Sequence, residues 1–289
     1  MKKNININKL NAKVFRRPLF YSLAKGADIN NILSSFESMV VDNEKLTVRD
    51  FFCSIFDSLR DSYRNEYVYK SALVNKIVFG RHSPKTSASS IELPINNSIV
   101  DVAIFNGTST AYEIKTEFDS PKRLVTQTPD YLDVFDRTYI VTHPDLADKY
   151  CSLDIPKVGV ISLNHRDNLR VVKEAESNSE NINIESIFNV LRRNEYVKII
   201  EDYTSTNVHM PNGLIYDYCK NIFVSMPLDK ANGYFIKAMK NRTINKDLID
   251  YLYSLPACLR VLGYATPLSK KQKNYLIDLM DKELKFNRC

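Results

Sequence analysis

Two acidic residues and a lysine flank one short turn of the sequence. Asp101 lies within an apolar run, and the next run closes with Glu113, Ile114 and Lys115. Carboxylates and a main-chain carbonyl, here that of Ile114, are the hard oxygen ligands that Mg²⁺ prefers. A lysine beside them can orient or deprotonate a water and offset the negative charge that develops on a phosphoryl oxygen. These residue types suit the hydrolysis of a phosphodiester with Mg²⁺ as cofactor, for which Mn²⁺ should substitute.

These side chains can act together only if a hairpin places them on one face of a sheet. Side chains alternate between the two faces of a strand, and opposed residues share a face. A two-residue loop would therefore put Asp101 and Glu113 on opposite faces. A three-residue loop over residues 105–107, with Gly107 in the left-handed region, makes the two acids diagonal neighbours on one face and adds Lys115 to it. We therefore expect an odd loop or a bulge at this turn.

The residues around the hairpin predict a mixed sheet between two helical regions. Alternating apolar residues indicate strands, and a helical segment over 121–134 suits a right-handed crossover. Helical spacing predicts helices before and after the sheet, including one over 65–79 with Gly80 as its C-cap, one that Thr47 caps, and a last one over 269–285. The expected strands are 91–95, 98–105, 109–115, 138–141, 158–162 and 169–172.

The polar segment 174–183 is interpreted as a linker. It divides the chain into an N-terminal helical region over 1–62, a core over 63–175 and a C-terminal helical region over 184–289.

Composition limits the class of protein. The 289 residues are 44% hydrophobic with a net charge of +6, which is ordinary for a globular protein and permits a phosphate-rich substrate. The five cysteines form no CxxC pair and the four histidines lie far apart, which argues against a zinc site or a histidine-based triad. No apolar stretch could cross a bilayer and the first residues lack a signal sequence, so we expect a cytoplasmic protein without a membrane partner.

Asp101 is the acid that is hardest to explain as a surface residue. It lies between Val100 and Val102 in what reads as a central, buried strand. A charge in such a place is costly unless it is paired or bound to a metal. The alternative to a metal site is a buried salt bridge, with Lys115 as one possible partner, in a fold without chemistry.

In this order the residues resemble the PD-(D/E)XK nuclease superfamily. Its motif is an acid on one strand, (D/E)-X-K on the next, and an acid on the preceding helix. Asp101, the run from Glu113 to Lys115, and Glu66 match these positions, while Val100 replaces the proline of the motif. The resemblance implies an α/β, restriction-endonuclease-like fold with a mixed central sheet flanked by helices. It covers residues 66–142, and it implies that Glu66 holds a second metal or a metal-bound water.

A second element is similar to the QxxxY motif of the RecB-like branch of this superfamily. Gln127 and Tyr131 are four residues apart, so in a helix they share a face. Pro129 departs from the pattern. Proline inside a helix is costly, so the helix could restart there with Thr128 as its N-cap. Such a restart would turn Gln127 away from the face that it shares with Tyr131.

The surrounding residues also look like a set of poorly characterised bacterial nuclease-like proteins, whose core has helices on both sides. Lys122 and Arg123 follow the candidate site closely and are expected to contact nucleic acid.

The function that this resemblance implies is Mg²⁺-dependent hydrolysis of nucleic acid, with DNA favoured over RNA and genome defence as one role. Two alternatives remain open: a catalytically silent module that binds nucleic acid or protein, and a toxin-like RNase that acts on tRNA. The complete set of Asp101, Glu113 and Lys115 argues against a silent site. Endonuclease and exonuclease action are not separated by the sequence, and neither a homodimer nor a partner protein is excluded.

Overall fold

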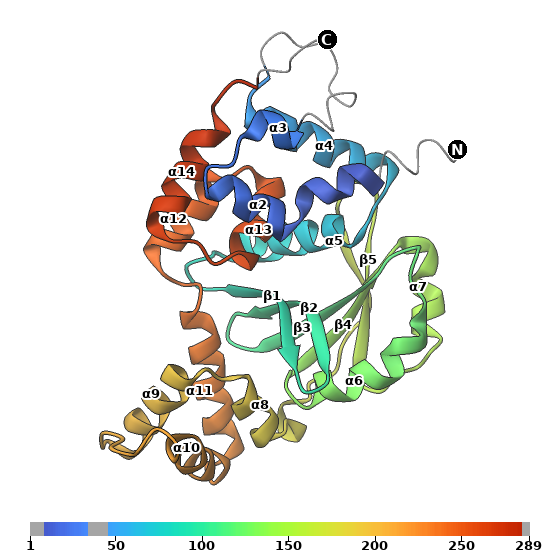
Figure 1. Cartoon of the computed structure of the whole chain (residues 1–289). Coiled ribbons are helices and arrows are strands. Elements are labelled where there is room, and N and C mark those ends of the chain that lie inside the picture. Colours follow the sequence, from blue (N-terminus) through green and yellow to red (C-terminus); the bar gives the residue numbers. More distant parts are fainter. Residues whose placement is uncertain (1–8, 34–45, 285–289) are drawn as a thin grey trace. The chain divides into compact units, whose positions relative to one another are not determined.

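The computed structural model describes residues 9–33 and 46–284, which form two compact units (Figure 1). Unit 1 combines both ends of the described chain, up to Arg81 and from Asn245 onward, with residues 165–168. Unit 2 contains residues 82–164 and 169–244. The division into three regions expected from the sequence, 1–62, 63–175 and 184–289, stays a prediction.

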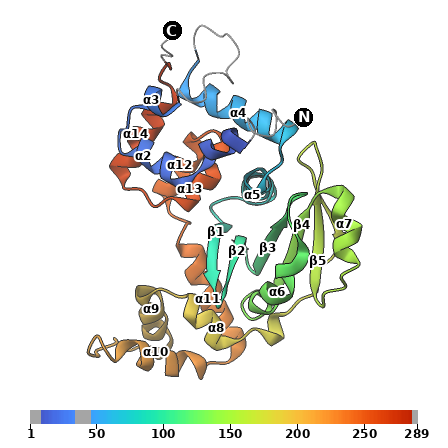
Figure 2. The ribbon, with the colours of Figure 1, turned by 45° about the vertical axis from the view of Figure 1, so that its right-hand side comes forward.

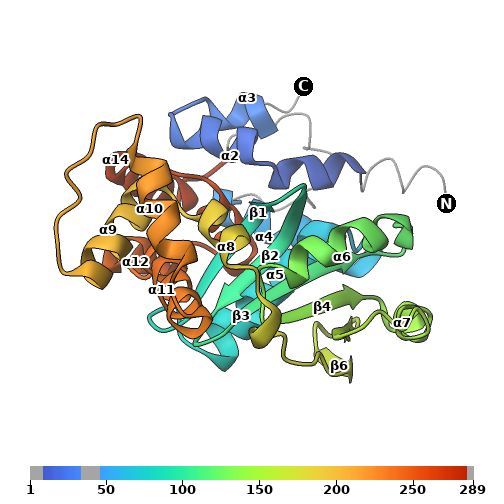
Figure 3. The same cartoon turned by 90° about the horizontal axis from the view of Figure 1, so that it is seen from below.

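Unit 2 is built on a six-stranded sheet with strand order β1-β2-β3-β4-β5-β6. The first three strands pair antiparallel, β3, β4 and β5 pair parallel, and β6 returns antiparallel to β5. Figure 2 shows β1 to β5 in this order, and Figure 3 shows β6 at the edge opposite β1. The strands are β1 (Ala88–Ile95), β2 (Ser98–Phe105), β3 (Ser109–Lys115), β4 (Arg137–Thr142), β5 (Val158–Leu163) and β6 (Leu169–Lys173).

The α/β fold class with a mixed sheet and flanking helices is therefore confirmed. The hairpin between β2 and β3 has the predicted odd loop, one residue later than expected. Phe105 pairs with Ser109, so the loop consists of residues 106–108 rather than 105–107. Its middle residue, Gly107, has a φ of 110°, a backbone region that glycine adopts without steric cost. The N–H of Asn106 donates to the carbonyl of Thr108 across the loop at 3.2 Å.

Two helical connections cross the parallel part of the sheet. A 3-10 turn (Pro121–Arg123) and helix α6 (Leu124–Leu132) join β3 to β4, and helix α7 (Pro144–Cys151) joins β4 to β5. Pro129 lies inside α6, which continues through it. The restart at Thr128 that the proline suggested does not occur.

Four helices follow β6 and gather at one end of the unit, beside β1 (Figure 1). The Phe105 ring meets Phe235 edge-on at 5.8 Å between centroids and Phe135 at 6.1 Å, so these helices share one core with the sheet. Helix α9 was not expected from the sequence. The four are α8 (Ile184–Val190), α9 (Arg193–Thr204), α10 (Ile215–Val224) and α11 (Leu228–Asn241).

The polar segment before α8 is held in place rather than being a free linker. Asn178 is buried, and its side-chain amide donates to the carbonyls of Leu132 at 2.5 Å and Phe135 at 3.4 Å. The segment therefore fixes the helices that follow it to the end of α6.

Unit 1 is helical, and the helix start predicted at Thr47 is present. Thr47 Oγ1 accepts from the N–H of Asp50 at 3.2 Å, and the Asp50 carboxylate accepts from the N–H of Thr47 at 3.1 Å, a reciprocal capping box. Its main helices are α2 (Arg17–Ala24), α3 (Ile29–Leu33), α4 (Val48–Ser62), α5 (Glu66–Leu73), α12 (Lys246–Ser254), α13 (Arg260–Ala265) and α14 (Lys270–Met280).

Two helix ends in unit 1 differ from the prediction. After α5 the chain continues as a π-helix, η3 (Val74–Arg81), so Gly80 lies inside a helical segment and is not its C-cap. Helix α14 ends at Met280, whereas the predicted end at 285 lies outside the described residues. Residues 1–8, which were expected to lack a signal sequence, also lie outside them. Across residues 9–33 and 46–284, no helix has the length and apolar character needed to cross a membrane.

Candidate active site

The candidate site lies where the backbone pairing of β2 and β3 ends. The last paired residues are Val102 and Tyr112. Continued by one residue, the same register sets Asp101 opposite Glu113, so the two acids share a face of the sheet. They are directly opposed rather than diagonal, because the loop lies one residue later than expected. The N–H of Ile114 donates to Oδ2 of Asp101 at 2.7 Å, so this carboxylate takes the place of a backbone partner.

Glu113 is held from two sides. It lies in the middle of β3, a strand in which every residue is buried, and is itself only 3% exposed. Lys115, two residues later on the same face, donates from Nζ to Oε1 of Glu113 at 2.5 Å. The hydroxyl of Tyr131 donates to Oε2 at 2.5 Å. Both carboxylate oxygens therefore have fixed partners from the strand and from α6.

Helix α6 supplies the two side chains of the QxxxY element. Gln127 and Tyr131 are one helical turn apart and lie on the face toward the sheet. Nζ of Lys115 is 3.4 Å from Oε1 of Gln127, and the hydroxyl of Tyr131 is 3.1 Å from the carbonyl of Ile99 in β2. The structure thus brings together Asp101, Glu113, Lys115, Gln127 and Tyr131 within unit 2.

The electrostatics of the site keep Tyr131 neutral. Its ring is fully buried, and burial is the largest cause that raises the pKa of its hydroxyl, followed by the charge of Glu113, the hydrogen bond to that residue, and the charge of Asp101. A neutral tyrosine remains a hydrogen-bond donor, so it fixes the orientation of the Glu113 carboxylate. Two carboxylates and one ammonium leave the cluster with one net negative charge.

The donor set fits a hard divalent cation. Asp101, Glu113 and the main-chain carbonyl of Ile114 offer only oxygen, and Mg²⁺ commonly takes one or two carboxylates and completes its shell with water. A carboxylate oxygen has two lone pairs, so it can accept a hydrogen bond and bind a cation together. Throughout the described parts of the chain, no three His, Cys, Asp or Glu side chains come together as a metal site. Further ligands here would have to be water.

Glu66 belongs to unit 1 and has a local partner. It lies in the first turn of α5, is exposed, and forms an ion pair with Lys70 one turn later. Lys70 is itself buried, so the carboxylate of Glu66 compensates a buried ammonium. The predicted role of Glu66 at a second metal stays a prediction.

The two basic residues expected to contact nucleic acid are exposed. Lys122 and Arg123 lie in the 3-10 turn that leads from β3 into α6. The Oγ atom of Ser120 accepts from the N–H of Lys122 at 3.2 Å and so caps this turn. Two apolar neighbours, Phe118 and Val125, are 63% and 78% exposed. The connection after β3 therefore offers both cationic and apolar surface.

One residue that supports the site was missed from the sequence. Thr142 ends β4 and pairs with Lys115 in the parallel register. Its hydroxyl donates to the carbonyl of Lys115 at 2.7 Å and fixes the backbone at the end of β3. No local signal identifies it, because its role depends on how far β4 extends beside β3.

Comparisons with known proteins give one family and two individual likenesses. The family model described as Bacteriophage P4 protein cII matches residues 59–255. Protein cII of Enterobacteria phage P4 is 28% identical over 145 residues, which are 49% of this chain and 53% of that protein, so the match spans about half of this relative. A solved structure of a protein of unknown function from Silicibacter pomeroyi aligns over 32% of this chain and 62% of its own, with 16% identity and a TM-score of 0.27.

That TM-score is too low to indicate a shared fold. The family match, by contrast, includes the whole sheet and every candidate residue from Glu66 to Tyr131. It extends over more than half of the sequence, and on this basis the chain belongs to the bacteriophage P4 protein cII family.

Proposed function

We propose that this protein is a metal-dependent nuclease with a restriction-endonuclease-like core of the PD-(D/E)XK type. One observation carries the proposal. The residues that match the motifs in the sequence are also joined by hydrogen bonds at the end of β3: Lys115 and Tyr131 bond the Glu113 carboxylate, Gln127 bonds Lys115, and Asp101 accepts from the N–H of Ile114. Two separate motifs, one on strands and one on a helix, thus support the same site.

Each residue has a role that follows from its contacts. A bound Mg²⁺ or Mn²⁺, held by Asp101, Glu113 and the Ile114 carbonyl, would neutralise charge on the scissile phosphate. Lys115, an ammonium in its pair with Glu113, would orient the attacking water and offset negative charge on the phosphoryl oxygens. Tyr131 keeps the Glu113 carboxylate in one orientation, as its hydroxyl does in the structure.

We favour DNA over RNA as substrate on the resemblance to the PD-(D/E)XK nucleases alone, because phosphate contacts do not distinguish the two. Most affinity of a nucleic-acid enzyme comes from phosphate contacts that carry no sequence information. Lys122 and Arg123 are exposed at the start of α6, close in sequence to the site, and are the first candidates for such contacts. Genome defence is the role we would examine first.

The test is a cleavage assay with a matched control. Purified protein is incubated with plasmid, linear duplex, single-stranded DNA and total RNA, each with Mg²⁺, Mn²⁺ or EDTA. Cleavage should require a divalent cation and should disappear in Asp101→Asn, which keeps the size of the side chain. Asp145→Asn, which changes a carboxylate whose side chain is 85% exposed in α7, should cut like the wild type. Full activity in EDTA, or in Asp101→Asn, would contradict the proposed site.

A silent binding module is the second candidate, and one observation favours it. Both oxygens of Glu113 are already satisfied within the protein, by Lys115 and by Tyr131. If the site is retained only as a buried ion pair, the protein would bind nucleic acid but would not cut it with any divalent cation. Calorimetric titration of Mg²⁺ separates the two, since a silent site needs no affinity for the cation. Selective cleavage of tRNA in the same panel would identify the toxin-like alternative.

A further inference from the structure

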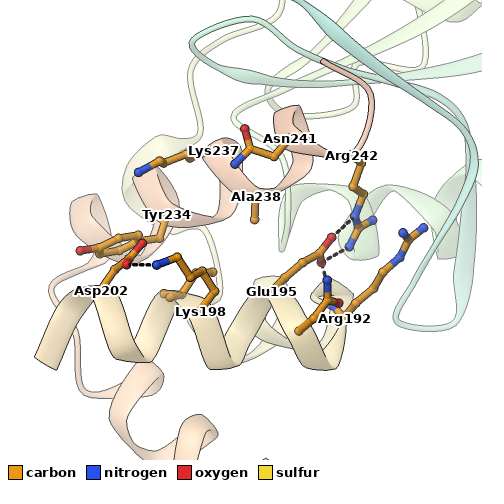
Figure 4. A pocket seen from close by; sticks show the side chains of 11 residues that line it. Arg192, Glu195, Lys198, Asp202, Tyr234, Lys237, Ala238, Asn241 and Arg242 are labelled. Atoms are coloured by element: carbon orange, nitrogen blue, oxygen red, sulfur yellow. Dashed lines mark hydrogen bonds and ion pairs between the residues drawn. The ribbon is translucent and has the colours of Figure 1, made fainter. Parts of the chain in front are cut away.

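A pocket of about 290 Å³ lies between helices α9 and α11 of unit 2 (Figure 4). Each helix presents one face to it, with side chains spaced by three and four residues. From α9 these include Glu195, Lys198 and Asp202, and from α11 Tyr234, Lys237 and Asn241. Such faces are normally apolar where two helices approach each other. The polar faces here indicate a pocket that holds water or a polar ligand.

The acids of the pocket are neutralised by two of its cations. Nε and Nη2 of Arg242 donate to the two carboxylate oxygens of Glu195 at 2.7 and 2.6 Å, and Nη2 also donates to the carbonyl of Val190 at 2.9 Å. The Glu195 and Arg242 side chains are only 11% and 9% exposed. Lys198 pairs with Asp202 at 2.7 Å. Both pairs are drawn in Figure 4.

Two further cations give the pocket a net positive charge. Arg192 and Lys237 line it and are exposed. Four cations against two acids leave a net charge of +2 among the lining residues, all of which are described. In Figure 4, Arg192 lies with Arg242 at one end of the pocket and Lys237 lies near Tyr234 at the other. Positive charge is therefore present at both ends.

The space between these ends depends on a small residue. Ala238 lies in the middle of the α11 face and is 9% exposed. A longer apolar side chain at this position would extend into the pocket without changing its charge.

We propose that this pocket binds the phosphate of a nucleotide, either free or as one unit of a nucleic-acid strand. Lys237 supplies charge for the phosphate, because charge-assisted hydrogen bonds are the strongest that a protein offers to an oxyanion, and Arg192 adds positive charge at the other end of the pocket. Tyr234, whose half-buried ring lines the pocket, supplies an aromatic face for a base. The volume is at the lower end of the range for small-molecule sites and suits one nucleotide rather than a duplex.

The choice of nucleic acid rests on the proposed nuclease function, since a nuclease must hold the strand beyond the bond it cuts. The experiment therefore measures binding in EDTA, where no cleavage occurs, by the anisotropy of a labelled single-stranded oligonucleotide. AMP and inorganic phosphate are titrated as competitors. Lys237→Ala should weaken oligonucleotide binding about five- to tenfold and lower the salt slope by about 0.7, as for one lost phosphate contact. Lys230→Ala, an exposed lysine in the same helix, is the matched control and should bind normally.

Ala238→Leu tests the pocket itself, because it removes space and no charge. It should reduce binding as much as Lys237→Ala, and thermal melting confirms that the variant is folded. If it fails to fold, Arg192→Ala takes its place. If AMP displaces the oligonucleotide from the wild type and Lys237→Ala abolishes this competition, the pocket is assigned to a free nucleotide. If the oligonucleotide binds and AMP does not displace it, the pocket is assigned to a strand.

Unchanged affinity for both ligands in Lys237→Ala and in the second variant would overturn the proposal. Failure of the nuclease proposal looks different, since it would be seen as absent cleavage while these binding differences remain.

Discussion

The buried ion pair between Glu113 and Lys115 should be among the most sensitive points of unit 2. Their side chains are 5% and 3% exposed, with 2.5 Å between Nζ and Oε1. Glu113→Gln removes the negative charge but keeps the shape and an acceptor for Tyr131. It leaves the Lys115 ammonium buried, with Oε1 of Gln127 at 3.4 Å as the remaining partner in this cluster. Removal of one partner of a buried pair costs about 3–5 kcal/mol of the free energy of unfolding.

The converse change and the double change complete a thermodynamic cycle. Lys115→Met keeps the length of the side chain and leaves the Glu113 anion buried, so it should also cost about 3 kcal/mol. In the double variant neither charge remains, and replacing a buried pair by neutral groups of similar size is often close to neutral. We therefore expect the double variant to lose less than either single one, with a coupling energy of about 2 kcal/mol or more.

Urea unfolding followed by circular dichroism and by tyrosine fluorescence measures all four proteins. The chain has 17 tyrosines and no tryptophan, so the fluorescence signal is spread over both units. If the two units unfold in separate transitions, only that of unit 2 should shift. Effects of the two single changes that add to within about 0.5 kcal/mol would refute the reasoning, since additivity is what independent residues show.

Three further outcomes follow from other contacts. Tyr131→Phe keeps the buried ring but removes the donor to Glu113, so single-turnover cleavage should fall by about tenfold or more while calorimetric Mg²⁺ affinity changes less. Burial acts to raise the pKa of Glu195, but hydrogen bonds from Arg242 and from the N–H of Arg192 bring this pKa below the usual 4.5. The contribution of the ionised carboxylate to stability is therefore present above pH 4.5 and is lost as the pH falls through the folded pKa. Urea unfolding between pH 6 and pH 3 should therefore show a smaller acid loss in Glu195→Gln, and an equal loss would contradict this. A Cβ on Gly159 would lie 2.5 Å from the Tyr139 ring, so Gly159→Ala should lower stability by about 1–3 kcal/mol, whereas Gly233→Ala, in open space within α11, should raise it by about 0.5–1 kcal/mol; thermal melting compares them.

The sequence predicted the central hairpin well, because its signals are local. Strands β2 and β3 begin and end at the predicted residues, since apolar alternation and the Asn106–Gly107 turn define both. The register was wrong by one residue in the loop, because two different three-residue loops give the same parity. An odd or even number of loop residues decides which face of the sheet a side chain occupies. The position of the loop decides which residue of the neighbouring strand lies directly opposite. Only the face can be deduced from the alternation of apolar residues.

The residues of the candidate site were predicted, but two of their contacts were not. Lys115 was considered as a partner of Asp101, but it pairs with Glu113, its neighbour on the same face of one strand. Pro129 was expected to disturb Gln127, yet α6 continues through it.

Helix α9 was missed although its sequence carries the helical signal. Tyr196, Ile199, Ile200 and Tyr203 recur at spacings of three and four residues, and the first three are buried.

The discontinuous make-up of unit 1 has a consequence for the order of folding during synthesis. All of unit 2 precedes residue 245, whereas unit 1 needs segments from both sides of it. Chains grow at about 5–20 residues per second, so the 45 residues from 245 to 289 take about two to nine seconds to add. During that interval Phe79 lacks the rings of Tyr253 and Tyr264 that pack against it. The sheet of unit 2 can therefore fold on the ribosome first. The early helices of unit 1 meanwhile expose apolar side chains, which a chaperone could cover.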